Sequence, residues 1–401
     1  DMPVNEVSKL IGYHVLYYSY NKEKLVNFRP TGSTETEEEQ NIKAGLYYKH
    51  RTRSSDAPTV ETTPTGASVM VYHLERYLPI FSYRYFQTKG IDAKNNYEAF
   101  YPNSTWTGDD GFNVSNASVK EYGIIANNGY IHAVDRVVEP LETIYTELKN
   151  KEKYSTFLDL YDSFGVYVAD DELSKSYAKA YGVDTLYQYQ HGGLPNIACE
   201  WPTSSYLNFT ALTALSYSIF APSNTAINSF FDSFWKIGGY SSMQEVDALA
   251  LNYFLYQFIY GGSMLFPEEL GDDELKNLAG SSLNINPAAL NEKTMCVNGA
   301  LYGMDEIKEP STFASVIGPL FQYKSARSFL YALLGSSLFS SYVSDLSKYI
   351  VLVPTAEQFE ASGIRTVYST QGLEAEGDDG WAEISNTAKQ NIVYLHSASI
   401  S

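Results

Sequence analysis

Apolar and polar positions alternate with two periods along this chain, and one arrangement of them occurs twice. The stretches Ser216 to Phe231 and Lys348 to Gly363 each hold an apolar run, then a proline (Pro222 or Pro354), then an amphipathic segment. A hydroxyl residue follows each proline and is well suited to accept hydrogen bonds from the first turn of a helix. Each stretch therefore predicts a strand, a proline and a capped helix.

A second arrangement is also duplicated, at a spacing of 170 residues: NGYIHAVDRVVEP begins at Asn128, and NGALYGMDEIKEP begins at Asn298. Asn-Gly favours a tight turn with positive φ, the apolar residues after it suit a buried strand, and a proline ends that strand. We expect positive φ at both glycines. The identical positions are Asn128, Gly129, Asp135, Glu139 and Pro140 in one copy, and Asn298, Gly299, Asp305, Glu309 and Pro310 in the other. Such a repeat predicts duplicated modules.

The segments around these repeats predict further elements. After Pro140, apolar residues such as Ile144, Leu148 and Phe157 recur at helical spacing. In SVMVYHLERY the side chains alternate between two faces, as in a strand, with Val69 and Val71 on the same face. Residues 51–68 are polar and rich in Thr, Ser and Pro, which predicts a solvated loop.

Together the two arrangements resemble the fasciclin domain, whose first box has the form "strand, F-A-P-S/T-N, helix" and whose second has the form "N-G-x-I-H-x-x-D-x-V-x-x-P". LIGYHVLYYSY, with Tyr13 and His14, resembles the Tyr-His stretch that lies between the boxes of that family. The resemblance implies an α+β fold of tandem modules, each a β-sheet wedge with packed helices. It also implies structural roles for the box residues, including His132. Tyr13 and His14 are candidate binding residues, although a structural role is favoured for the His14 imidazole.

The chain departs from the family pattern at several positions. Tyr256-Gln257 stands where Tyr-His is expected in the middle module, and Tyr302 replaces the histidine of the second box. Leu395-His396 stands at the corresponding place in the last module. We therefore expect residues 1–140 to be a module without its N-terminal part, 141–310 a complete module with an insertion, and 311–401 the N-terminal part of a further module. Either the chain is a fragment with unseen ends, which we favour, or the two partial modules complete each other in space.

Composition excludes some classes of binding partner. The chain has 28 Lys and Arg against 47 Asp and Glu, a formal charge of -19, so nucleic acid and anionic lipid headgroups are not expected partners. Tyrosine occurs 35 times. Tyr83, Tyr85 and Phe86 are candidates for an aromatic binding surface, although packing of these rings in the core is the favoured alternative.

Catalytic and cofactor motifs are missing from the sequence. It holds no G-x-S-x-G, H-E-x-x-H, paired C-x-x-C or P-loop, so we expect no cofactor, metal or catalytic residue. Cys199 and Cys296 fit either one disulfide or two buried thiols, and we favour thiols. No apolar run is long enough to span a membrane.

These observations favour a non-enzymatic cell-surface binding or adhesion protein that recognises a protein or a polysaccharide. The resemblance extends to bacterial surface lipoproteins of Bacteroidetes type, which implies an extracellular position and an outer-membrane anchor outside this chain. An alternative is an accessory lipoprotein docked on an outer-membrane transporter complex for glycan uptake. An alternative of another class is a glycan-cleaving enzyme, which would need two carboxylates converging across a cleft.

Overall fold

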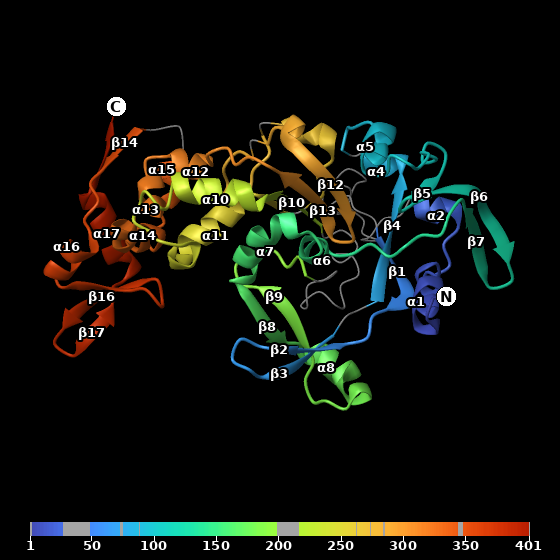
Figure 1. Cartoon of the computed structure of the whole chain (residues 1–401), viewed down its shortest axis with the longest axis horizontal. Coiled ribbons are helices and arrows are strands. Elements are labelled where there is room, and N and C mark those ends of the chain that lie inside the picture. Colours follow the sequence, from blue (N-terminus) through green and yellow to red (C-terminus); the bar gives the residue numbers. More distant parts are fainter. Residues whose placement is uncertain are drawn as a thin grey trace. The chain divides into compact units, whose positions relative to one another are not determined.

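The protein is α+β, with helices and strands mixed along its whole length (Figure 1). The computed structural model describes residues 2–26, 49–72, 75–87, 89–198, 216–261, 263–272, 274–283, 285–343 and 348–400. It divides into two compact units: unit 1 comprises Asp1–Ala221, Ile259–Leu275 and Asn284–Met304, and unit 2 comprises Pro222–Phe258, Lys276–Leu283 and Asp305–Ser401. These units cut across the three consecutive modules expected from the sequence, so that division stays a prediction.

Unit 1 contains most of the strands. Its strands are β1 (Lys49–Ser55), β2 (Thr59–Thr62), β3 (Ser68–Val71), β4 (Glu75–Ser82), β5 (Phe112–Val114), β6 (Ala117–Ala126), β7 (Gly129–Val134), β8 (Gly165–Ala169), β9 (Tyr187–His191), β10 (Tyr217–Pro222), β11 (Ile259–Gly261), β12 (Leu290–Cys296) and β13 (Gly299–Met304). Its helices are α1 (Val4–Tyr13), α2 (Lys22–Val26), α4 (Tyr83–Gln87), α5 (Ala93–Phe100), α6 (Ile144–Lys149), α7 (Ser155–Asp162) and α8 (Asp171–Tyr177), with 3-10 turns at Glu152–Tyr154, Ala178–Tyr181, Pro267–Gly271 and Pro287–Ala289.

Three sheets organise unit 1, with strand orders β1-β4-β5-β6-β7, β11-β10-β13-β12 and β2-β3-β9-β8. Among the described residues, β7 is the last strand of the first sheet, and its hairpin with β6 projects beyond the other strands in Figure 1. The second Asn-Gly turn joins β12 to β13, where Cys296 pairs with Gly299. Both Asn-Gly segments therefore form hairpins, as predicted.

The prediction of a loop at residues 51–68 is wrong, because half of these residues belong to β1 and β2. β1 pairs antiparallel with β4, and Thr52 donates a 2.7 Å hydrogen bond from its hydroxyl to the carbonyl of Arg76. Thr52 and Ser54 are buried. A polar strand is stable here because its buried hydroxyls find hydrogen-bond partners. The alternation at Val69 and Val71 is confirmed, since both are buried in β3.

Unit 2 contains most of the longer helices. Its helices are α10 (Asn224–Ser233), α11 (Ala248–Tyr256), α12 (Ser311–Ala314), α13 (Gly318–Gln322), α14 (Arg327–Leu334), α15 (Phe339–Val343), α16 (Ala356–Ala361) and α17 (Asn386–Leu395), with 3-10 turns at Met243–Glu245 and Lys324–Ala326. Its strands are β14 (Lys348–Val351), β15 (Ile364–Val367), β16 (Gly372–Gly377), β17 (Gly380–Glu383) and β18 (Ser397–Ile400), which pair as β14-β18 and β15-β16-β17. In its core, Phe230 on α10, Phe254 on α11 and Phe313 on α12 contact the ring of Trp235.

Both predicted helix starts are confirmed. Ser223 caps α10 by accepting from the N–H of Ala226, and Thr355 forms a capping box with Gln358 at the start of α16. The strands before them each pair antiparallel with a strand that follows a helix C-cap, in registers that differ by one residue when counted from Pro222 and Pro354. β10 pairs Ile219 with Ile259 on β11, and β14 pairs Ile350 with Ala398 on β18. Ile259 lies two residues after Gln257, the C-cap of α11, and Ala398 lies two residues after His396, the C-cap of α17.

Candidate binding groove

A half-open groove of about 610 Å³ runs along unit 1 between residues 14–20 and β7. We name it the β7 groove. Its twenty lining residues include no Asp, Glu, Lys or Arg, in a chain with 47 acidic residues. They are His14, Val15, Leu16, Tyr17, Tyr18, Ser19, Tyr20, Leu25, Leu78, Ile80, Phe112, Val114, Ala126, Asn128, Gly129, Tyr130, Ile131, His132, Val134 and Val138. An uncharged, largely apolar groove suits an uncharged ligand.

The floor of the groove belongs to a hydrophobic core cluster of unit 1. Leu78, Ile80, Phe112 and Val114 are buried members of one cluster that also holds Tyr13. The Tyr13 hydroxyl donates a 2.9 Å hydrogen bond to the carbonyl of Tyr77, which fixes the end of α1 on β4. The expected binding role of Tyr13 is wrong, because its side chain is fully buried.

One wall of the groove is an extended segment that follows α1. The N–H of Tyr17 donates to the carbonyl of Arg51, and the N–H of Arg53 donates to the carbonyl of Val15, so this segment pairs with β1. Leu16 lies opposite Thr52 between these two bonds. Hydrogen-bonding groups alternate between the two edges of a strand, and the backbone groups of Leu16 therefore face the other edge, on the side of the groove.

Two histidines hold the walls in place. His14 Nε2 accepts from the N–H of Val138 at 3.0 Å, so its proton lies on Nδ1, which donates to the carbonyl of Leu10 at 2.8 Å. His132 has the opposite tautomer, because its Nδ1 accepts from the N–H of Gly123. Its Nε2 donates to the carbonyl of Tyr20 at 3.0 Å, across the end of the groove. Both imidazoles thus have both nitrogens engaged, which fits a structural role.

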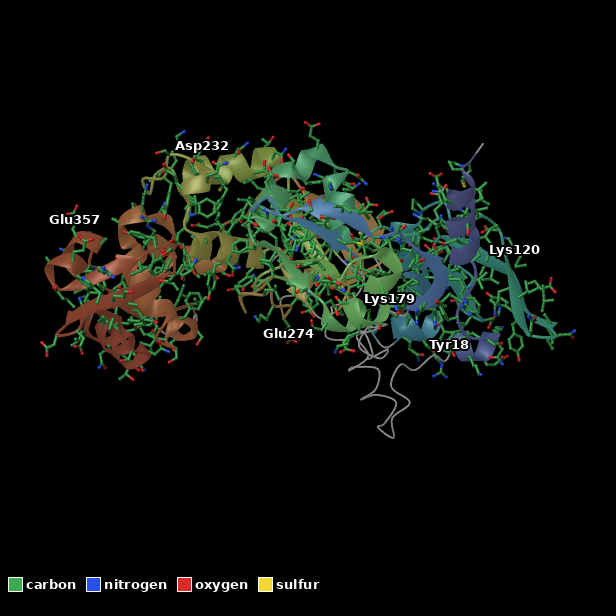
Figure 2. All side chains as sticks on the ribbon, turned by 90° about the horizontal axis from the view of Figure 1, so that it is seen from below. Tyr18, Lys120, Lys179, Asp232, Glu274 and Glu357 are labelled. Carbon is green, nitrogen blue, oxygen red and sulfur yellow. The ribbon has the colours of Figure 1, made fainter. Side chains whose placement is uncertain are left out.

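The other wall is β7, and its residues are far more exposed than their repeat partners. Tyr130 is 42% exposed and Ile131 is 55% exposed, whereas Ala300 and Leu301, 170 residues later on β13, are 0% exposed. The first copy is therefore not the buried strand expected from the sequence. Tyr18, which lines the same groove, is also exposed and is labelled in Figure 2.

The sheet that contains β13 explains this difference. There β10 lies between β11, which follows the cap residue Gln257, and β13, which carries the second box. The N–H of Tyr217 on β10 donates to the carbonyl of Asn298 at the start of β13. In the β7 groove the segment after His14 takes the place of β11, and β7 takes the place of β13. The described residues supply no strand between them.

The two box glycines differ for the same reason. Gly299 has φ +142°, and a Cβ there would lie 1.9 Å from the Tyr217 carbonyl oxygen. Gly129 has no positive φ, and among the described atoms a Cβ there would meet only the Ser19 hydroxyl, at 3.8 Å. The expectation of positive φ is therefore wrong for Gly129 and right for Gly299. The close approach of β10 constrains Gly299, whereas no strand of the described residues approaches Gly129.

The other box residues hold their local structure. Asp135 accepts from the N–H of Ser118 at 2.9 Å, while Asn298 is buried and bonds to the backbone of Ile144 and Ile197. Asn128 is exposed, and so is Asp305. Pro140 and Pro310 follow β7 and β13 and precede α6 and α12, as predicted. Pro222 ends β10, and Pro354 lies between β14 and α16.

The candidate aromatic binding surface at residues 83–86 is not formed by Tyr85 and Phe86. Tyr85 and Phe86 are 0% exposed, and their rings contact Phe81 and Phe266. The segment forms the short helix α4, so neighbouring rings turn inward together. Tyr83 is half-buried against the core cluster. The alternative of core packing therefore holds for Tyr85 and Phe86.

Sequence reasoning missed a polar cluster around Asp162 in unit 1. Asp162 accepts from the hydroxyls of Tyr189 and Tyr145 at 2.9 and 3.2 Å, and His191 Nε2 lies 3.1 Å from the same carboxylate. Burial, and then the Asp162 carboxylate, raise the pKa of both tyrosines. These residues lie on three elements far apart in sequence, which left no local motif to find.

Cys296 is a buried thiol, and burial raises its pKa well above the ordinary value. Cys199 lies outside the described residues, so the expectation of two thiols stays a prediction. Within the parts of the chain that the structure describes, no three His, Cys, Asp or Glu side chains gather as metal ligands. The described helices also include none with the length and hydropathy of a membrane span.

No protein-family model and no curated protein matches the sequence. Among solved structures, the chain is similar to one described as a FAS1 domain pair from the insect cell adhesion molecule fasciclin I. The identity is 11%, the match covers 76% of this chain and 81% of that chain, and the TM-score is 0.26. At this identity and TM-score, the likeness carries no information on a partner or an activity.

Proposed function

We propose that the protein is a non-enzymatic binding protein of fasciclin-like modules, and that the β7 groove takes an extended polypeptide segment as an added strand. The observation that carries the proposal is the groove between two strand edges, at the place that β10 fills in the middle module. Strand addition of this kind draws affinity from backbone hydrogen bonds and specificity from alternate side chains. An uncharged groove floor suits a segment of alternating apolar residues.

The fasciclin-like boxes support a place on the extracellular face of the cell and a role in adhesion. An outer-membrane lipoprotein anchor and docking on a transporter complex for glycan uptake stay predictions from the sequence resemblance. Recognition of a polysaccharide through groove tyrosines such as Tyr18 and Tyr130 is the alternative ligand class.

The glycan-cleaving alternative would need an acid and a second carboxylate that are available to a sugar. Asp162 has the surrounding tyrosines that such a site would use, yet both of its oxygens already accept hydrogen bonds within unit 1. This favours a structural anchor between α7 and β9. The binding proposal is therefore preferred.

The test is binding of a peptide with the sequence of Ser216–Ser223, SYSIFAPS, which contains the β10 strand. Fluorescence anisotropy of the labelled peptide should show saturable binding, and a scrambled peptide should bind at least tenfold more weakly. Ile131→Asp should reduce the affinity at least tenfold, because it places a charge on the uncharged wall. Val60→Asp is the matched control, because Val60 is exposed on β2 in another sheet of unit 1.

No binding of the peptide, or equal binding by both variants, would refute the proposal. Binding of oligosaccharides by the intact chain, lost in Ile131→Asp, would move the groove to the polysaccharide alternative.

A further inference from the structure

The strand β14 in unit 2 has the properties of the strand that the β7 groove lacks. It pairs antiparallel with β18, the strand that follows the cap residue His396, as β10 pairs antiparallel with β11, the strand that follows the cap residue Gln257. Both strands lead through a proline and a hydroxyl cap into a helix. β14 is thus the counterpart of β10.

β14 differs from β10 in having one uncovered edge. In its sheet β14 pairs with β18 alone among the described residues, whereas β10 pairs on both sides. Ile350 is 52% exposed and Leu352 is 64% exposed, whereas Ile219 and Phe220 are 0% exposed. An exposed apolar strand edge is a template for pairing with another chain.

A hollow of about 570 Å³ lies beside the end of β14, lined by apolar residues that include Leu352, Phe359 and Ile392, together with His396. His396 caps α17 as His14 caps α1, and its Nδ1 lies 2.7 Å from the carbonyl of Ile392, four residues back. At His14, the other ring nitrogen is covered by the backbone of Val138, just after β7. The segment after β7 thus covers the His14 ring, whereas the corresponding ring of His396 borders an open hollow.

Resting on the proposed function of the groove, we infer that its occupant is β14 of a second copy of this chain. In the joined state β14 lies between residues 15–18 of its partner and β7, as β10 lies between β11 and β13. β14 gives up its pairing with β18, which follows the C-cap His396, for pairing with residues 15–18 of the partner, which follow the C-cap His14. The backbone hydrogen bonds between β14 and β7 are then additional.

The chemistry of the two surfaces agrees with this exchange. The groove has no charged lining residue, and residues 349–354, YIVLVP, carry no charge. Each copy has a formal charge of -19, so the copies repel each other at long range. Salt should therefore strengthen the association, because it screens that repulsion and removes no ion pair from the contact. The contact is head-to-tail, since groove and strand are different surfaces, and it can extend beyond two copies.

The experiment measures the mass of the chain by light scattering and sedimentation from about 1 to 200 µM, a range that brackets µM affinities. The wild type should form dimers and larger species, and more of them in 0.5 M than in 0.05 M salt, as expected for weaker long-range repulsion. Gly129→Val blocks the groove, because a side chain there would occupy the path of the docked strand. Ile350→Asp places a charge on β14.

Each of these two variants should be monomeric by itself. An equimolar mixture should form one-to-one dimers and nothing larger, because Ile350→Asp supplies an intact groove and Gly129→Val supplies an intact β14. This rescue also shows that neither variant has failed to fold. Val60→Asp, with the same added charge as Ile350→Asp, should associate as the wild type does.

A wild type that is monomeric throughout the range would overturn the inference, as would a mixture without dimers. If the monomeric wild type still binds SYSIFAPS, the groove accepts a strand from another source and the proposed function stands. If it binds neither the peptide nor itself, both fall.

Discussion

Alanine substitution at the two box glycines, Gly129 and Gly299, should change the free energy of unfolding by different amounts. At Gly299 the new Cβ would lie 1.9 Å from the carbonyl oxygen and 2.7 Å from the nitrogen of Tyr217, at a φ of +142°. The backbone strain costs about 1–3 kcal/mol, and the forced displacement of a packed strand costs about 1–3 kcal/mol more. Gly299→Ala should therefore lower the free energy of unfolding of unit 1 by roughly 2–6 kcal/mol.

Gly129→Ala is the matched comparison, because Gly129 occupies the same place in the other hairpin of the same unit. Within the described part of the chain, its Cβ would meet only the Ser19 hydroxyl, at 3.8 Å. Since glycine in a strand costs roughly 0.5–1 kcal/mol relative to alanine, this variant should be as stable as the wild type or slightly more so. Its affinity for SYSIFAPS should nevertheless fall, because a docked strand would approach as closely as β10 approaches Gly299.

The assay is urea denaturation combined with amide hydrogen exchange. Exchange is needed because a chain with two compact units need not unfold in a single transition. Protection should fall in β12 and β13 of Gly299→Ala and stay unchanged in β6 and β7 of Gly129→Ala. Equal stability of the two variants would show that the approach of β10 to β13 is not what constrains this glycine.

Three further predictions concern pH and capping. Burial lowers the pKa of His50 to about 3, so below about pH 6.5 the unfolded chain takes up a proton that the folded chain does not, and unit 1 should lose about 2 kcal/mol of stability between pH 7 and 5. Urea titrations of His50→Asn should show a smaller loss over this range, and an equal loss would contradict the assignment to His50. Burial alone would raise the pKa of Asp56, but the charge of Arg76 and hydrogen bonds from Lys9 and Arg76 outweigh burial and hold this pKa below its usual value. Asp56→Asn should therefore lower the free energy of unfolding by about 1–3 kcal/mol at pH 7, and this deficit should shrink as the wild-type carboxylate is protonated below about pH 4. A deficit that does not change with pH would point to a packing defect. Thr355→Ala removes the cap of α16 and should cost about 1 kcal/mol, seen as faster exchange of the α16 amides, while Thr355→Ser should keep their protection; similar exchange in both variants would mean that the cap contributes little.

Local chemistry was enough to predict several elements. The caps at Ser223 and Thr355 and the turns at Asn128 and Asn298 depend on residues within four positions of each other, so their sequence is sufficient. Burial was harder to predict. The two second-box strands have similar sequences, yet one is covered and the other is open, because coverage depends on whether a strand such as β10 lies beside it.

Polar strands and long-range clusters escaped prediction for related reasons. β1, KHRTRSS, has no apolar alternation, and its burial follows from pairing with β4 and from hydroxyl contacts such as that of Thr52. The three partners of Asp162 come from α6 and β9, which no spacing along the chain relates to α7. The aromatic residues Tyr85 and Phe86 read equally well as surface or core, and only their contacts decide.

The interleaving of the two units has a consequence for protease digestion and for expression in pieces. Each unit is assembled from three stretches of sequence, so the chain passes between the units five times. A single cut in one of these passages would leave the units joined by the remaining four. Expression of residues 1–221 alone would supply β10 but none of β11, β12 and β13. Neither unit can therefore be obtained as one continuous fragment, and limited digestion should yield nicked, still-associated chains rather than separated domains.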